Sequence, residues 1–294
     1  MTVSATQTDS SFDKTRSNHA QRASAAAEAW VARVPSTVSA AMGAERYPFA
    51  ACVMTDAEHF TEVTDGMDPC DVVELVRVYF NALFAPVVKH GGRVVDVKGD
   101  GILAVWTDCT SAPQLRNRVC SACLEMAEAV DRFNAAHPTQ RLPTRIGVDI
   151  GRIAVADLGA LACLQRRAVG DPVVTASRLE QLNKELGTRI LVSAAVAEGE
   201  YGHVFRDLGA FRLRGKHSDI RVLELVGHRR TITARQRGLC EGFAAAMRSY
   251  QDGECEAAAA AFRRLRSRYP DDGATRYYAG RCSGNQEYCL HHNP

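Results

Sequence analysis

The sequence predicts an α+β domain followed by a small helical appendage. From Tyr47 to about Val226, short β-rich runs alternate with helical runs whose apolar residues recur every three or four positions. After Arg229 the composition shifts to Ala, Arg and Glu, which is typical of helices. With 294 residues, of which 46% are hydrophobic, the chain can bury a full core.

Residues 1–46 are predicted to lie outside the folded domain. Residues 1–22 are rich in Ser, Thr, Gln and charge, so burial cannot offset the entropy of ordering them, and we expect a disordered tail. Ala23–Met42 is alanine-rich with apolar residues at helical spacing, interrupted by Pro35. We expect a short connecting helix there.

The main domain is expected to span residues 47–228. Its first β-rich run, Phe49–Asp56, precedes a helix predicted over Asp71–His90, with Asp68-Pro69 as the entry signal. Two short strands, Arg93–Val97 and Ile102–Trp106, flank a tight turn at residues 98–101. The remaining expected elements are a helix over Leu115–Asn134, a strand pair around Thr144–Asp157, a helix over Asp171–Glu185, and strands near Arg189–Val192, Val204–Leu208 and Ile220–Leu225.

Residues 229–294 are predicted to form the helical appendage. Two antiparallel helices are expected over Phe243–Tyr250 and Cys255–Tyr269, and a third near Ala274 after the stop signal Pro270-Asp271-Asp272-Gly273. This form resembles a single tetratricopeptide-like unit. One such unit cannot bury its own apolar face, so we expect it to pack on the main domain, in a structural or partner-facing role.

Composition argues against several classes of partner. The formal charge is +2 with no long block of one sign, so neither nucleic acid nor an anionic membrane is expected to bind. No stretch approaches the roughly 20 apolar residues that span a bilayer, and the start has no signal-peptide pattern. The ten cysteines are scattered without paired metal knuckles. We therefore expect a cytoplasmic protein with free thiols.

Two carboxylates stand out by their position in this pattern. Asp56 ends the first strand and Asp100 lies in the hairpin turn, so adjacent strands would present both at one edge of the sheet. Paired carboxylates at such an edge suit Mg²⁺ or Mn²⁺, which take oxygen ligands and leave room for water and phosphates. The alternative is that Asp56 caps a helix and Asp100 is an ordinary turn residue.

Five segments together resemble the class III adenylate and guanylate cyclases, over roughly residues 47–226, in the order and spacing of that family. They read TDAEHFT (55–61), HGGRVVDVKGDGILAVW (90–106), RIGVDIG (145–151), AVGDPVVTASRLE (168–180) and GTRILVS (187–193). The resemblance implies a ferredoxin-like, palm-type cyclase homology domain. The chain also resembles a bacterial subgroup of this family that has a tetratricopeptide-like extension at its C-terminus.

The resemblance also implies a mechanism and a set of site residues. Asp56 and Asp100, helped by the backbone of Ala57, would hold two Mg²⁺ or Mn²⁺ ions. The ribose 3′-hydroxyl of ATP would attack the α-phosphate and release pyrophosphate, while Arg178 stabilises the developing charge. Lys216 would bind the terminal phosphates, the alternative being a solvated loop lysine. Each site would be shared by a homodimer, with metals from one subunit and Arg178 from the other.

Several positions depart from the family pattern. The base-reading lysine is replaced by Asp96 and its acidic partner by Arg167, so the charges are exchanged, which leaves ATP favoured over GTP only by resemblance to the subgroup. Val174 stands where the family has an asparagine that orients the substrate. Losing one positioned donor commonly slows a reaction by about 10²–10³-fold. In addition, Asp149 replaces a histidine and His59 a glycine.

Two functional hypotheses follow from these residues. The first is an adenylate cyclase in intracellular signalling, favoured because Asp56, Asp100 and Arg178 are all present. The alternative, favoured by Val174, is a catalytically weak cyclase-like module that binds nucleotide or regulates an active homologue. A diguanylate-forming relative ranks lower, because the hairpin turn reads KGDG rather than GG[DE]EF.

Overall fold

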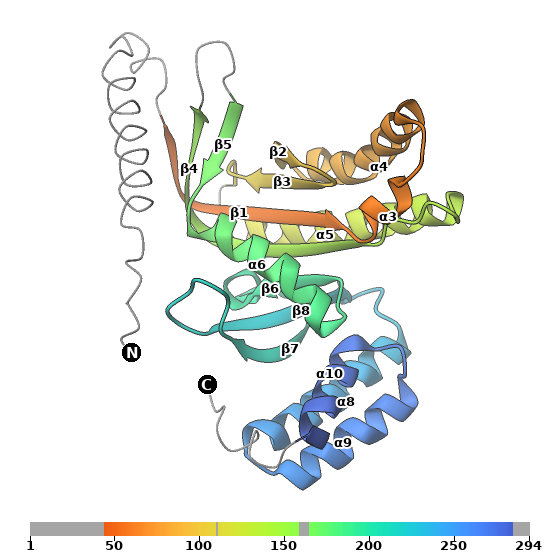
Figure 1. The fold of residues 1–294 in the computed structure, drawn as a ribbon. Helices are drawn as coiled ribbons and strands as arrows, with labels where there is room; N and C mark the ends of the chain where they lie inside the picture. The colour runs from red at the N-terminus through yellow and green to blue at the C-terminus, as the bar shows by residue number, and fades with distance from the viewer. Residues whose placement is uncertain (1–43, 110, 159–164, 285–294) are drawn as a thin grey trace, which may run out of the picture.

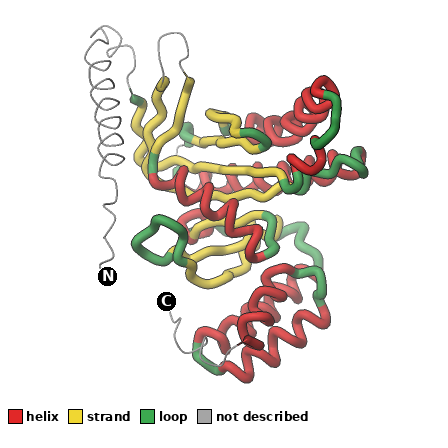
Figure 2. The backbone as a smooth tube through the Cα atoms, in the orientation of Figure 1, coloured by secondary structure: helices red, strands yellow, loops and turns green. Residues whose placement is uncertain are grey.

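The computed structural model describes residues 44–109, 111–158 and 165–284. The predicted tail and connecting helix therefore lie outside the described residues, except for residues 44–46. Within those ranges a single mixed sheet forms the middle of the molecule, as the strands in Figures 1 and 2 show. Its strand order is β2-β3-β1-β4-β6-β8-β7, and β5 pairs with β4 beside this path.

The elements have the following bounds. The strands are β1 (Glu45–Ala57), β2 (Arg93–Lys98), β3 (Gly101–Trp106), β4 (Thr144–Leu158), β5 (Gln165–Val169), β6 (Ile190–Ser193), β7 (His203–Phe211) and β8 (Ile220–His228). The helices are α3 (Phe60–Thr64), α4 (Pro69–Lys89), α5 (Ala112–Ala136), α6 (Asp171–Leu186), α7 (Ala194–Ala197), α8 (Ala234–Gln251), α9 (Cys255–Arg268) and α10 (Gly273–Gly284). All predicted helices outside residues 1–46 are present; the short helices α3 and α7 were not predicted.

The strand pair expected around Thr144–Asp157 was wrong. The segment is one strand of 15 residues, β4, and its hairpin partner β5 was not predicted. Gly147 and Gly151, which interrupt the apolar pattern, serve the packing of α6 instead of a turn. A Cβ on Gly147 would lie 2.0 Å from the backbone oxygen of Ala176, and one on Gly151 would lie 2.9 Å from the Pro172 ring.

Helices cover both faces of the sheet. On one face α4 and α5 bury a core that includes Tyr79, Trp106 and Met126. On the opposite face α6 crosses in front of β1 and β4 (Figure 1), where Ala176 joins a second core with Cys52 and Leu103. The sheet is thereby fixed between two layers, and the ends of β1 and β3 are held in place.

The C-terminal helices form a further layer beside β7 and β8 (Figure 1). Their apolar residues share one core with α6 and the sheet, as we expected of a unit that cannot bury its own face. Phe243, Phe262 and Tyr278 are buried there in mutual contact. The ring centroid of Phe243 lies 5.5 Å from that of Phe262 and 5.7 Å from that of Tyr278. Likeness to a tetratricopeptide unit stays a prediction. None of the helices in the described ranges is long and apolar enough to cross a membrane.

Candidate active site

Asp56 and Asp100 lie where two neighbouring strands meet. Strand β1 pairs antiparallel with β3, so the end of β1 lies beside the turn that precedes β3. The approach is close enough to require a glycine: a Cβ on Gly101 would lie 2.0 Å from the backbone oxygen of Thr55 and 3.4 Å from Cα of Asp56. The backbone N–H of Ile102 also donates to the Thr55 hydroxyl at 3.1 Å. The hairpin that carries Asp100 is thus fixed against the residues around Asp56.

The carboxylates of Asp56 and Asp100 repel each other electrostatically. Burial and, second, the negative charge of Asp56 raise the pKa of Asp100 above its ordinary value. Backbone N–H groups of Asp100 itself and of Ala57 donate to this carboxylate and oppose the shift, as does the charge of Arg145. Repulsion between two nearby carboxylates is what a bound cation relieves.

The donor set fits a hard divalent ion. It consists of carboxylate oxygens at the end of β1 and in the β2–β3 turn, and such oxygens suit Mg²⁺ or Mn²⁺. No cluster of three or more His, Cys, Asp or Glu side chains suited to a metal occurs in the described part of the chain. An ion held by two carboxylates keeps coordination positions for water and for phosphates.

Arg145 completes this group and was not among the predicted site residues. It stands opposite Asp56 across the β1–β4 pairing, and its Nη2 lies 2.6 Å from Asp56 Oδ2. Its Nε donates to Glu180 on α6 at 3.1 Å, and its Nη1 lies 3.8 Å from Glu58. The side chain of Arg145 is only 14% exposed. The sequence signal was an arginine in RIGVDIG, a segment whose other residues, apart from Asp149, are apolar or glycine; a buried arginine is rarely found without a partner.

Glu180 responds to the same charges. Burial first, and then the charge of Asp56, raise the pKa of Glu180 to about 7, although Arg145 opposes the shift. The carboxyl of Glu180, on the sheet-facing side of α6, is therefore coupled electrostatically to Asp56, which is expected to hold the metal. One network thus links β1, β4 and α6 at the site.

The exchanged pair forms within one subunit. The guanidinium of Arg167 on β5 donates to the carboxylate of Asp96 on β2, and also to Gln165. Lys98 lies 3.8 Å from the same carboxylate. Asp96 is 11% exposed and Arg167 is 37% exposed, so the pair is partly shielded from water. The two departures from the family pattern therefore compensate each other in charge.

Three further predicted residues belong to α6 or contact it. Val174 is 49% exposed. Arg178 donates to Gln181 at 2.8 Å, while its Nε is buried without a hydrogen-bond partner. Lys216 donates to Asp171, and its side chain is only 11% exposed, so it is not a freely solvated loop lysine.

The predicted residues fall into separate groups within one chain. Asp56, Ala57 and Asp100 come together, and Asp96 comes together with Arg167. Across the described ranges, no hydrogen bond or ion pair joins Arg178 to either metal-site aspartate. A single chain therefore does not unite the arginine with the carboxylates.

The other two departures have structural explanations. His59 has φ 63°, a left-handed conformation that glycine adopts without cost, and it is the only such non-glycine residue in the described ranges. Asp149 is buried on β4 and accepts a hydrogen bond from Ser193, and burial raises its pKa. Its hydroxyl partners and the charge of Lys216 oppose that shift, which places Asp149 near Lys216.

Comparison with known proteins shows the family of the chain. The family model for the adenylate and guanylate cyclase catalytic domain matches residues 42–225, which include both aspartates, Arg145 and all of α6. The chain belongs to this family. The part that follows the cyclase domain, with helices α8–α10, lies beyond the match.

Two curated relatives of this chain are named adenylate cyclases. Adenylate cyclase 1 of Rhizobium meliloti (strain 1021) is 33% identical over 190 residues, which cover 63% of this chain and 29% of that protein. The terminal-differentiation specific adenylate cyclase of Dictyostelium discoideum is 25% identical over 237 residues, covering 79% of this chain and 11% of that protein. The chain thus spans less than a third of the length of either relative.

Solved cyclase structures share the fold. The adenylyl cyclase CyaB from P. aeruginosa superposes with a TM-score of 0.57 at 20% identity, covering 65% of this chain and 100% of that one. The guanylyl cyclase Cya2 superposes with a TM-score of 0.56 at 24% identity, covering 65% of this chain and 98% of that one. The predicted α+β cyclase fold is confirmed by these likenesses.

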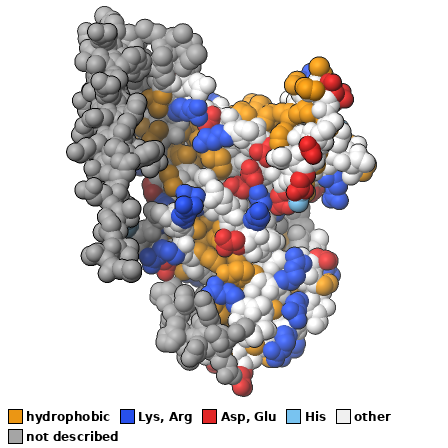
Figure 3. All heavy atoms as spheres, viewed as in Figure 1, with side chains coloured by type: hydrophobic (Ala, Val, Ile, Leu, Met, Phe, Trp, Pro, Cys, Tyr) orange, Lys and Arg blue, Asp and Glu red, His pale blue; other side chains and the backbone are white. Residues whose placement is uncertain are grey.

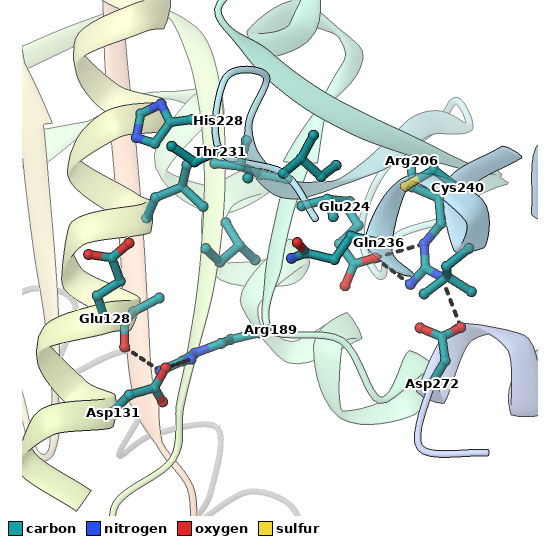
Figure 4. Close-up of a pocket in the computed structure, with 18 residues that line it drawn as sticks. Glu128, Asp131, Arg189, Arg206, Glu224, His228, Thr231, Gln236, Cys240 and Asp272 are labelled. Carbon is teal, nitrogen blue, oxygen red and sulfur yellow. Dashed lines mark hydrogen bonds and ion pairs between the residues drawn. The ribbon is translucent and has the colours of Figure 1, made fainter. Parts of the chain in front are cut away.

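A large cavity of the protein lies away from the two aspartates. It has a volume of about 590 Å³ and lies between α5, β8 and α8 (Figure 4). Its walls include Arg206, Glu224 and Asp272 but neither Asp56 nor Asp100. The candidate active site is accordingly the open edge where β1 and the β2–β3 turn meet.

Proposed function

We propose that this cyclase converts ATP to cyclic AMP and pyrophosphate as a homodimer that uses two Mg²⁺ or Mn²⁺ ions per site. The observation that carries the proposal is the meeting of Asp56 and Asp100 at the end of β1, with the N–H of Ala57 directed at the Asp100 carboxylate. ATP is favoured because adenylate cyclases are among the relatives, one of them 33% identical over 190 residues.

The residues of the chain have separate tasks in this reaction. Asp56 and Asp100 hold the cations, while Arg145 and the N–H of Ala57 fix the two carboxylates in place. When bound, the cations lower the pKa of the ribose 3′-hydroxyl and neutralise phosphate charge. The 3′-hydroxyl gives its proton to solvent as its oxygen bonds to the α-phosphorus, the bond from that phosphorus to the pyrophosphate oxygen breaks, and Arg178 stabilises the charge on the α-phosphate oxygens. Lys216 would neutralise the terminal phosphates once it leaves Asp171.

The exchanged pair would face the base. An aspartate can accept a hydrogen bond from the exocyclic amine of adenine, and an arginine can donate to a ring nitrogen. Because Arg167 is already held by Asp96, its guanidinium is oriented before the nucleotide arrives. Preorganisation of this kind reduces the entropy lost on binding.

A second subunit would complete each site. Within one chain Arg178 contacts neither aspartate, which supports delivery of this arginine to the carboxylates of a partner. Exposed apolar side chains occur on β2, β4, β5 and α6, and Figure 3 shows hydrophobic side chains over β4 and β5 on this face. They are Val97, Leu158, Val169 and Val174, each between 47% and 58% exposed. Burial of these side chains between two subunits would add apolar contact area to the dimer.

Val174 favours a second candidate function, a catalytically weak cyclase-like module that binds nucleotide or regulates a homologue. Its side chain is 49% exposed on α6 and can donate no hydrogen bond to a ribose or phosphate. A site without this donor would bind the nucleotide but turn it over slowly.

One assay separates the two functions. The purified protein is incubated with ATP or GTP and Mn²⁺, beside a Val174→Asn variant, and cyclic mononucleotides and dinucleotides are quantified. Cyclic AMP from the wild type supports the enzyme; product from the variant alone supports the weak module. A dinucleotide product, or higher activity with GTP, would contradict the proposed reaction.

Mixing two inactive variants tests the shared site. Asp100→Asn and Arg178→Ala should each abolish activity alone, whereas a mixture forms heterodimers in which one of the two sites is intact. Random exchange of subunits should restore about a quarter of the wild-type activity. Failure of the mixture to recover activity, with subunit exchange verified by native mass spectrometry, would rule out a site built from both chains.

A further inference from the structure

Helix α6 carries residues of the candidate active site and also packs against the C-terminal helices. Val174 and Arg178 are on it, and Glu180 reaches from it to Arg145. Its apolar positions Leu179, Leu182 and Leu186 are buried in the core shared with α8, α9 and α10. Any displacement of α6 therefore affects both regions.

The end of α6 is in direct contact with the start of α10. Gly187, which follows α6 with φ 61°, meets Gly273, the first residue of α10. A Cβ on Gly273 would lie 2.1 Å from the backbone oxygen of Gly187 and 2.5 Å from its Cα. The two backbones touch without a side chain between them, so α10 cannot move toward α6 without displacing it.

A buried ion triad fixes α10 in this place. Arg206 on β7 is 4% exposed and donates to Glu224 on β8 and, at 2.8 Å, to Asp272. Asp272 also accepts from the backbone N–H of Thr275 at 2.9 Å, which caps the first turn of α10. Figure 4 shows Arg206 between the two carboxylates, with Asp272 coming from the segment that leads into α10. The start of α10 is thus tied to the sheet of the cyclase domain.

The triad lines the cavity of about 590 Å³, which separates part of α8 from α5 and β8. On that side the C-terminal helices do not fill the space against the domain. The C-terminal helices instead pack directly on the domain through the core that they share with α6 and β7, and through the Gly187–Gly273 contact. The position of the helical unit is therefore transmitted to α6 as well as to β7.

We propose that the C-terminal helices position Arg178 for catalysis, by holding the end of α6 through the Gly187–Gly273 contact and the Arg206–Asp272 ion pair. This inference rests on the proposed function of Arg178. Gly273 and Asp272 are positioning residues: they touch no substrate and act through α6. Misplacement of a catalytic group by about 1 Å can lower a rate by about 10²-fold, so a small shift of α6 has a measurable effect.

Two substitutions in α10 form a matched pair for the test. Gly273→Ala adds a methyl group against the Gly187 backbone, whereas Gly280→Ala adds the same group where nothing lies within 4 Å. Gly273→Ala should lower kcat about 10-fold to 10²-fold with KM for ATP unchanged, because Arg178 acts on charge that develops in the transition state. It should also speed hydrogen–deuterium exchange in residues 171–186. Gly280→Ala should behave as wild type in both measurements.

A second pair covers the case in which Gly273→Ala does not fold. Asp272→Asn keeps a helix cap but removes the charge that pairs with Arg206. Its control is Asp207→Asn, which breaks the exposed pair with Arg221 between β7 and β8. Asp272→Asn should reduce kcat and speed exchange in α6, and Asp207→Asn should do neither.

The outcomes separate this inference from the proposed function. Wild-type kcat and wild-type α6 exchange in a folded Gly273→Ala or Asp272→Asn protein would overturn the inference, and so would an equal loss in the matched controls. If the wild type forms no cyclic nucleotide, the proposed function fails, and exchange in α6 decides by itself whether the C-terminal helices hold this helix.

Discussion

The guanidinium of Arg145 lies 2.6 Å from the carboxylate of Asp56, across the pairing of β1 and β4. Its other nitrogens face Glu180 and Glu58, and the side chain is only 14% exposed. Arg145 therefore fixes the rotamer of Asp56 and compensates the charge of Glu180 at once. Both effects depend on the fork of the guanidinium, which a lysine ammonium cannot reproduce.

Replacing Arg145 should separate activity from stability. Arg145→Met leaves Glu180 buried without its cationic partner, so we expect the free energy of unfolding to fall by about 1–3 kcal/mol. Cyclase activity should also be lost. The double variant Arg145→Met/Glu180→Gln should recover most of the stability but not the activity, because Asp56 stays unsupported. Urea unfolding and cyclic AMP formation are the measurements. Arg77→Met, which breaks an exposed ion pair with Glu74 on α4, is the control; full activity in the double variant would contradict the role of Arg145.

Glu180 should make the metal-free protein less stable at high pH. Its pKa is about 7 in the folded protein against an ordinary value of 4.5, so the folded state binds this proton more tightly than the unfolded state. The stabilisation is complete below about pH 4.5 and is lost as the pH rises through about 7, by up to about 3 kcal/mol. Urea unfolding at pH 5 and pH 8 in a chelator should show this loss in the wild type.

The Glu180→Gln variant isolates that effect from other titrating groups. His203, for example, acts in the opposite direction, since burial lowers its pKa and acid destabilises the fold. The difference between wild type and variant removes such shared contributions. We expect the wild type to lose more stability than the variant between pH 5 and pH 8, and equal slopes would refute the assignment.

Much of the fold was predictable because most elements bury one face and so show their period in the sequence. The helices α4, α5 and α6 were predicted nearly to their ends, and so was the β2–β3 hairpin. Strand β4 was misjudged as a pair of strands, and its Gly147 and Gly151 are required by the approach of α6. Long-range packing of this kind leaves no local pattern from which it could be foreseen.

The site could be predicted only in part. That Asp56 and Asp100 meet follows from the adjacency of a strand end and a hairpin turn, which the sequence pattern already indicates. The contacts of Arg145 with Asp56 and Glu180 depend on the register of β1 and β4 and on how α6 packs on the sheet. Both are set by residues far apart in the sequence. For Lys216 a phosphate-binding role and a solvated loop lysine both stayed open in the sequence, because its contact with Asp171 is to a residue 45 positions away.

His59 offers a test of backbone strain beside the metal site. Its φ of 63° costs about 1–2 kcal/mol for a residue with a Cβ, whereas glycine adopts it freely. His59→Gly should therefore be about 1 kcal/mol more stable than His59→Ala, since both lose the exposed contact with Glu62. Thermal or urea unfolding of the two variants measures this difference. A more stable alanine variant would show that the turn relaxes out of the left-handed region.

The exchanged pair on β2 and β5 should be coupled energetically and should influence base selection. Asp96→Ala leaves Arg167 without its carboxylate, and Arg167→Ala leaves a carboxylate that is 11% exposed without its cation, so each single variant should be destabilised. The double alanine variant should lose less than the sum, with an interaction energy of about 0.5–3 kcal/mol by urea unfolding. The exposed Arg221–Asp207 pair, treated in the same way, should give a smaller interaction energy.

If the Asp96–Arg167 pair also faces the base, Asp96→Asn should lower the ratio of kcat/KM for ATP to that for GTP, because an amide accepts a hydrogen bond from the adenine amine more weakly than a carboxylate does. Additive stability losses would show that the two residues act independently, and an unchanged nucleotide ratio would remove Asp96 from base recognition.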